Sequence, residues 1–71
     1  MLIEIEVEGR PFEVEVRARL RDGSMEYVAE VCAAMVSFYD AREERCGESI
    51  EAALLKVALA LREAIERQLE I

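Results

Sequence analysis

The sequence predicts an α+β fold of the order ββαα, in which an N-terminal β-hairpin packs on two antiparallel helices. Three observations support this prediction. The first twenty residues alternate apolar and charged side chains with a period of two, the apolar residues after Met25 recur at helical spacing, and all three glycines fall between the expected elements. We therefore expect one domain, with a hairpin over residues 2–21, a first helix over 24–46 and a second helix over 49–70.

The hairpin is expected to turn at Gly9-Arg10. A short type II′ turn there would place Val7 opposite Phe12, whereas Pro11, which has no N–H, also allows a longer loop over Glu8–Pro11. Either loop keeps every apolar side chain on one face, as a half-buried sheet requires. These side chains are Ile3, Ile5, Val7, Phe12, Val14, Val16, Ala18 and Leu20.

The two helices are delimited by capping residues. Ser24 follows Asp22-Gly23 and is a favourable N-cap for the first helix, and Gly47 is placed to end it as a C′ glycine. Ser49 is the expected N-cap of the second helix. Within the first helix, Cys32 and Cys46 would stand about 21 Å apart, too far to form a disulfide.

The second helix carries more apolar surface than one packing face needs. Leu55 and Leu59 project from the side nearly opposite its main apolar stripe. We interpret them as oligomer contacts, the alternative being two ordinary exposed leucines. A 71-residue chain buries little surface by itself, and partner subunits are a usual remedy.

The polar face of the hairpin also predicts a symmetric dimer. If the second strand pairs antiparallel with its own copy around Val16, Glu15 faces Arg17 of the copy and Glu13 faces Arg19. The dimer would then have a four-stranded sheet. Two other interpretations remain open: an ordinary solvated face, and a carboxylate cluster for Ca²⁺ or Mg²⁺, which lacks the loop and carbonyl ligands such a site uses. The predicted dimer interface is Glu13, Glu15, Val16, Arg17, Arg19, Leu55 and Leu59.

Composition favours some classes of function and disfavours others. The net charge of −7 argues against binding to nucleic acid or an anionic membrane, and no apolar run is long enough to span a bilayer. The chain has no histidine, no metal-binding spacing and no phosphate-binding loop, so we expect neither an enzyme nor a cofactor. The two cysteines do not make a disulfide framework, so a reducing, cytoplasmic location is expected. Cys32 is expected as core filling, and Cys46 as the more exposed thiol.

The hairpin and the second helix resemble the ZapA family of bacterial cell-division proteins. Residues 5–14 follow the family's apolar-x-apolar-x-Gly-x-x-aromatic-x-apolar pattern, and residues 54–64 resemble the Ala-Leu-rich start of its long helix. Ala60 stands where the family has Asn, and these 71 residues do not include the family's long coiled coil. The resemblance implies a cytoplasmic dimer whose heads contact and cross-link FtsZ filaments.

Three functions are therefore expected, with the enzyme class last. The first is a homo-oligomeric scaffold that binds another protein bivalently, such as FtsZ. The second is a designed or orphan oligomer with no natural ligand, a hypothesis that fits the use of eight arginines, one lysine and no asparagine, as does a thermophilic origin. The third is an acidic, antitoxin-like module that covers a basic surface on another protein.

Overall fold

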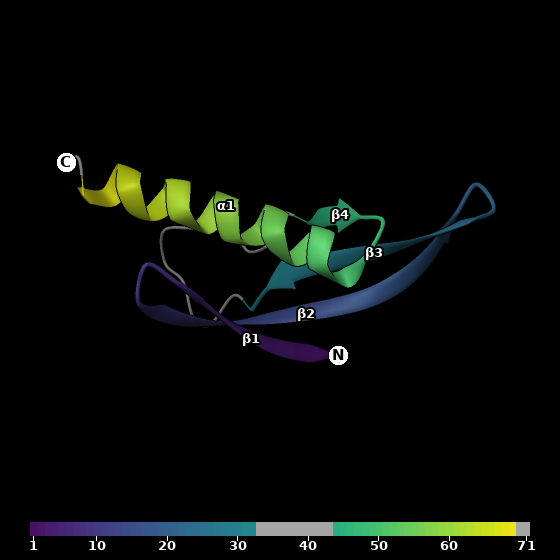
Figure 1. The fold of residues 1–71 in the computed structure, drawn as a ribbon, viewed down its shortest axis with the longest axis horizontal. Coiled ribbons are helices and arrows are strands. Elements are labelled where there is room, and N and C mark those ends of the chain that lie inside the picture. The colour runs from purple at the N-terminus through teal and green to yellow at the C-terminus, as the bar shows by residue number, and fades with distance from the viewer. Residues whose placement is uncertain (33–43, 70–71) are drawn as a thin grey trace.

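The computed structural model describes residues 1–32 and 44–69, which form one antiparallel sheet and one helix (Figure 1). The sheet has the strand order β1-β2-β3-β4. The helix lies across one face of this sheet, which we call the helix face, and we call the other side the opposite face. The elements are β1 (Leu2–Val7), β2 (Arg10–Arg21), β3 (Ser24–Val31), β4 (Arg45–Gly47) and α1 (Ile50–Leu69).

The α+β class and the N-terminal hairpin are confirmed, and α1 lies where a helix over 49–70 was predicted, whereas the predicted arrangement of two helices is not supported. The predicted helix over 24–46 is wrong, because Ser24–Val31 is strand β3 and Arg45–Gly47 is strand β4. Residues 33–43 of that predicted helix lie outside the described residues. The four-stranded sheet is formed within a single chain and not by two copies.

Both hairpins close with two-residue turns in which both residues have positive φ. The φ angles are 50° at Glu8, 75° at Gly9, 49° at Asp22 and 77° at Gly23. This pair of left-handed residues defines a type I′ turn, whose twist matches that of the strands it joins. The first turn is therefore at Glu8-Gly9, one residue earlier than predicted.

The earlier turn shifts the pairing of β1 with β2 by two residues. Val7 lies opposite Arg10 and Ile5 lies opposite Phe12, whereas the sequence placed Val7 opposite Phe12. Because side chains alternate with a period of two, a shift of two leaves each of them on its predicted face. The prediction for the faces is thus confirmed although the register is wrong.

Strand β3 forms because β2 is twice as long as β1 and needs a second partner. Asp22-Gly23 reverses the chain, and β3 then pairs with Val14 to Arg21 of β2. Tyr27, Val28 and Val31 are residue types that favour strands. Ser24 therefore follows a turn and opens a strand, and it does not cap a helix.

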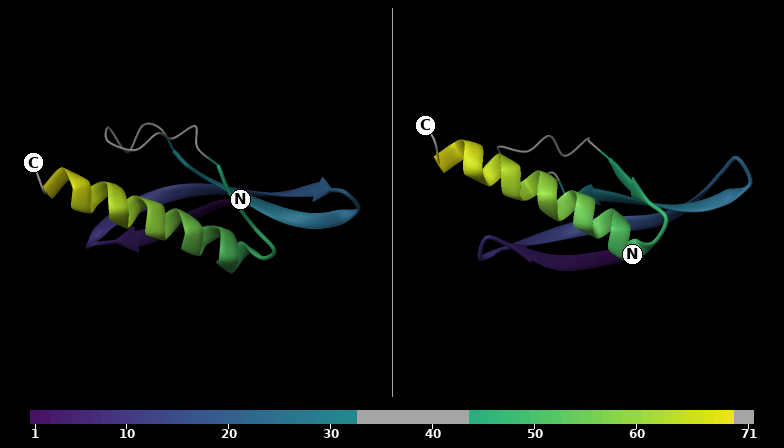
Figure 2. Two further views of the ribbon diagram at one scale, coloured as in Figure 1. Left: turned by 90° about the horizontal axis from the view of Figure 1, so that it is seen from above. Right: turned by 45° about the horizontal axis from the view of Figure 1, so that its top comes forward.

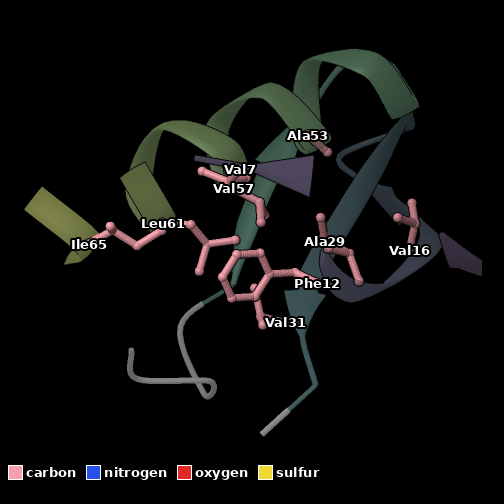
Figure 3. Close-up of a cluster of buried hydrophobic side chains, with 10 residues drawn as sticks. Val7, Phe12, Val16, Ala29, Val31, Ala53, Val57, Leu61 and Ile65 are labelled. Carbon is pink, nitrogen blue, oxygen red and sulfur yellow. The ribbon is translucent and has the colours of Figure 1, made fainter. Parts of the chain in front are cut away.

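The core lies between the helix face of the sheet and α1 (Figure 3). Four residues of α1 spaced by four, from Ala53 to Ile65, form its buried stripe. Figure 3 shows Leu61 of α1 and the ring of Phe12 of β2 pointing toward one another. The buried core residues are Val7, Phe12, Val14, Val16, Ala29, Val31, Ala53, Val57, Leu61 and Ile65.

Polar contacts fix α1 near both ends of the sheet. At its start, the backbone N–H of Ala52 donates to Ser49 Oγ at 3.1 Å, which confirms the predicted N-cap. Lys56 Nζ donates to the carbonyl oxygen of Cys46 in β4 at 2.6 Å. Farther along, Arg62 Nε lies 3.3 Å from a carboxylate oxygen of Glu8, in the β1–β2 turn.

Candidate interaction surfaces

The opposite face of the sheet carries a network of ion pairs on β2, β3 and the approach to β4. Arg19 is its best-paired member, with its Nε 2.7 Å from Glu26 Oε1 and its Nη1 3.6 Å from Glu44. Arg17 contacts Glu30 at 3.4 Å and also pairs with Glu44. Each carboxylate of this network pairs with an arginine of β2. Ion pairs therefore link β2 to β3 and to Glu44, the residue before β4, in addition to the backbone hydrogen bonds of the sheet.

The network surrounds a buried apolar residue and a thiol. Val28 is fully buried, and it lies between Arg17 on β2 and Cys46 on β4 in the strand register. Arg19 Nη2 lies 3.5 Å from Cys46 Sγ. The pKa of Arg19 is raised, first by its hydrogen bond to Glu26 and further by the charges of Glu26, Cys46 and Glu44, while desolvation opposes the shift. Arg19 therefore stays charged in this network.

The predicted pairing of the second strand with its own copy around Val16 is wrong, because both sides of β2 are occupied within the chain at this point. The Val16 N–H donates to the carbonyl oxygen of Met1 at 2.8 Å, and Val16 also pairs with Ala29 of β3. Its side chain is in the core. The arginines expected to reach a second copy, Arg17 and Arg19, instead contact glutamates of β3.

The remaining predicted interface residues of β2 lie near the β1 side of the opposite face. Glu15 Oε1 is 3.0 Å from the amino group of Met1. Glu13 is exposed and lies directly opposite Glu4 of β1, with Glu6 two residues farther along β1. Within residues 1–32 and 44–69, Glu4, Glu6 and Glu13 have no ion pair, so this edge of the sheet carries uncompensated negative charge.

The outer face of α1 exposes the two leucines singled out in the sequence. Leu55 is 61% exposed and Leu59, one turn later, is 50% exposed. The buried stripe of the helix faces the sheet, so these side chains point away from the core of their own chain. We call Leu55 and Leu59 the helix patch.

A second exposed apolar surface lies at the far end of the β2–β3 hairpin. Leu20 of β2 is 70% exposed and pairs with Met25 of β3, which is 54% exposed, and Ala18 beside them is also exposed. Figures 1 and 2 show that this end of the hairpin extends beyond the first turn of α1. We call residues 18–27 the hairpin arm, and Ala18, Leu20 and Met25 the arm patch.

The arm patch was missed because the sequence placed Met25 in a helix. Two signals could have found it. Asp22-Gly23 is a strong hairpin dipeptide, and the alternation of Met25, Tyr27 and Ala29 with Glu26, Val28 and Glu30 matches a strand as well as a helix. The arm patch lies on the helix face, because Ala18 and Leu20 continue the row of Val14 and Val16 along β2 beyond the N-terminal start of α1.

The described residues offer surfaces more than cavities. They contain no pocket and no group of three or more side chains that could hold a metal ion. Cys32 and Cys46 are free thiols, both half-buried. The described helix is not apolar enough along its length to cross a membrane.

Comparisons with protein-family models, with curated proteins and with solved structures find no match for this chain.

Proposed function

We propose that this protein is a non-enzymatic interaction module that works as a homo-oligomer, with the outer face of α1 at the contact between copies. The observation that carries the proposal is the helix patch. Leu55 and Leu59 are both at least half exposed and lie one turn apart on a helix whose other side is already buried. Burying the exposed half of a leucine contributes about 1 kcal/mol, so two leucines from each of two copies contribute about 4 kcal/mol.

Sedimentation equilibrium of the double variant Leu55→Glu/Leu59→Glu tests this proposal. The wild-type chain is expected to sediment as an oligomer of its 8.1 kDa subunit, and the variant as a monomer. The matched control is Glu63→Ala/Arg67→Ala, which changes an exposed pair with the same spacing on the same helix. An oligomer that persists in the leucine variant would remove the helix patch from the contact.

The ZapA-like role of cross-linking FtsZ filaments remains a prediction that rests on the sequence resemblance alone. The fold differs from what the resemblance implies, because strand β3 occupies residues where a first helix was expected. A dimer with two equivalent binding surfaces would still be able to cross-link filaments. Co-sedimentation with FtsZ polymers tests this role, and the same amount of protein in the supernatant with and without polymers would contradict it.

A second candidate function is binding to a basic surface of another protein, and the edge of the sheet at β1 favours it. β1 is an edge strand, so the outward backbone groups of Leu2, Glu4 and Glu6 have no strand partner among the described residues. Pairing β1 with its own copy would place Glu4 against glutamate in most registers. A strand with alternating lysines would instead pair with Glu4, Glu6 and the neighbouring Glu13.

Calorimetric titration with a strand-forming peptide of alternating valine and lysine tests this second candidate. We expect binding that weakens as salt is added and that is lost in Glu4→Lys/Glu6→Lys. Glu63→Lys/Glu66→Lys is the control, because it changes the net charge equally on α1, which lies on the other side of the sheet from Glu4 and Glu6. Equal loss in both variants would show attraction to net charge alone and would contradict a site at β1.

A further inference from the structure

We infer that two copies pair through antiparallel α1 helices, and that Glu51 and Arg62, which flank the helix patch, set this orientation. The inference rests on the proposed self-association and specifies the direction of the helices and the residues that meet. Figures 1 and 2 show the sheet on one side of α1 only. The helix patch is on the other side, where both of its leucines are at least half exposed.

Glu51 and Arg62 lie on the same edge of the outer face, beside Leu55. With 3.6 residues per turn, Glu51 is about 40° and Arg62 about 20° around the helix from Leu55, both in the direction away from Leu59. Both side chains are exposed. A helix that packs on the helix patch therefore meets these two charges along one edge of the contact.

Both charges are available for a partner. Glu51 has no ion pair within residues 1–32 and 44–69. Arg62 directs its Nε to Glu8 and Glu66, at 3.3 and 3.2 Å, and neither of its Nη groups has an ion pair among the described residues. The guanidinium group is thus able to accept a further carboxylate from a second copy.

The two charges and the two leucines are symmetric about the same point of α1. Val57 is the midpoint of Leu55 and Leu59, and Glu51 and Arg62 stand six residues before it and five residues after it. A two-fold axis across α1 at Val57 places each Leu55 against Leu59 of the copy. The same axis brings Glu51 to within about 1.5 Å, along the helix axis, of the level of Arg62 of the copy. Two ion pairs then border a cluster of four leucines.

A parallel pair of helices would instead bring like charges together in the middle of the contact. A two-fold axis along the helices places each residue level with its own copy. Glu66 lies between Leu55 and Leu59 in direction around the helix, so it would meet Glu66 of the copy. In the antiparallel pair, Glu66 stands nine residues past Val57, whereas α1 begins seven residues before it, so Glu66 lies beyond the start of the partner's helix.

Disulfide trapping at a protein concentration of about 1 mM, where the contact of the leucines alone is half formed, tests the orientation. In a background of Cys32→Ser/Cys46→Ser, the variants Glu51→Cys and Arg62→Cys are oxidised separately and as a mixture. The mixture is expected to give a covalent heterodimer, because the two positions stand level. Each variant alone is expected to stay monomeric, because its thiols are about 18 Å apart for Glu51→Cys and about 15 Å apart for Arg62→Cys.

Glu66→Cys in the same background distinguishes the two orientations. Its thiols are about 27 Å apart in the antiparallel pair and adjacent in a parallel one, so no covalent dimer is expected. A covalent dimer of Glu66→Cys alone, without a heterodimer in the mixture of the other two variants, would overturn the antiparallel contact and leave self-association standing.

Charge exchange tests the same contact in a chain that keeps both cysteines. Glu51→Arg and Arg62→Glu each turn two attractions into two repulsions, so each variant alone is expected to dimerise about tenfold more weakly than the wild type. A heterodimer of the two variants regains both pairs, so the average mass of their mixture in sedimentation equilibrium is expected to exceed that of either variant alone. A mixture of Glu63→Arg and Arg67→Glu carries the same charges outside the contact and is expected to show no such gain.

The outcomes separate this inference from the proposed function. An equal gain in mass in both mixtures would show attraction between net charges alone and would overturn the pairing of Glu51 with Arg62. A wild-type oligomer whose variants give neither a cross-link nor a gain in mass would overturn the antiparallel helix pair and leave self-association standing. A wild-type chain that is monomeric at about 1 mM would overturn both. The substituted side chains of α1 are exposed, so the substitutions do not disturb the core.

Discussion

Gly47 of β4 and Ala53 of α1 approach so closely that no side chain fits between them. A Cβ added at Gly47 would stand 2.6 Å from the backbone nitrogen of Ala53 and 2.8 Å from Cβ of Ala52. Gly47 is half-buried in a strand, and its φ is not positive, so the need for glycine there is one of space. The sequence predicted that Gly47 ends a helix. In the structure, Gly47 instead allows the start of α1 to pack directly against β4.

Gly47→Ala is therefore expected to destabilise the fold by about 1 to 3 kcal/mol, the usual cost of overpacking a close contact. The backbone of Ala53 cannot move without moving the start of α1. Urea unfolding followed by circular dichroism measures the change, and Glu48→Ala, one residue later and exposed, is the control. Equal stability of the two variants would contradict the close approach.

The two serines that the sequence assigned as helix caps should now behave differently. Ser49 accepts a hydrogen bond from the N–H of Ala52, so Ser49→Ala is expected to cost about 1 kcal/mol of unfolding free energy. Ser24 is exposed and opens β3, so Ser24→Ala is expected to change it by less than about 0.5 kcal/mol. Similar losses at both positions would instead support a helix beginning at Ser24.

On the opposite face of the sheet, the burial of Val28 is expected to contribute more to the free energy of unfolding than the surrounding ion pairs do. Val28 is fully buried, and Val28→Ala is expected to cost about 2 kcal/mol. Arg17 is nearly half exposed, so Arg17→Ala is expected to cost less than about 1 kcal/mol in low salt, and less still in high salt. Urea unfolding at two salt concentrations compares them, and a larger loss at Arg17 would reverse this ranking.

Self-association should make thermal stability depend on protein concentration. Because oligomers dissociate as they unfold, the Tm of the wild-type chain is expected to rise with each tenfold increase in concentration. The Leu55→Glu/Leu59→Glu variant should lose this dependence, while Glu63→Ala/Arg67→Ala should keep it. Calorimetry over a hundredfold range of concentration provides the measurement. A wild-type Tm that is constant over that range would contradict the oligomer.

The parts of the fold that could be predicted are those in which periodicity and local capping agree. Alternation placed the side chains of β1 and β2 on their correct faces, and Ser49 with the apolar stripe of residues 50–65 located α1 to within one residue. The side of α1 that exposes Leu55 and Leu59 was also correctly identified. These features depend on neighbours close in sequence, which a pattern of residue types describes well.

The error at β3 arose because residues 24–31 satisfy two patterns at once. Val28, Val31 and Cys32 have helical spacing, whereas Tyr27, Ala29 and Val31 alternate as a strand does. The choice is decided by a distant requirement, since the long strand β2 needs a partner for its second half. The same choice determines the candidate interaction surfaces. Because β3 pairs with β2, Arg17 and Arg19 contact glutamates of β3 and not those of a second copy. The arm patch exists because β2 and β3 form a second hairpin.

The most direct test of self-association is the mass of the wild-type chain, measured by light scattering after size-exclusion chromatography. Our account predicts a species with twice the mass of the 8.1 kDa chain at protein concentrations of about 1 mM, the dissociation constant to which about 4 kcal/mol corresponds. A single species at the mass of one chain over the whole concentration range would contradict it. The helix patch and the arm patch would then be free to bind a different protein.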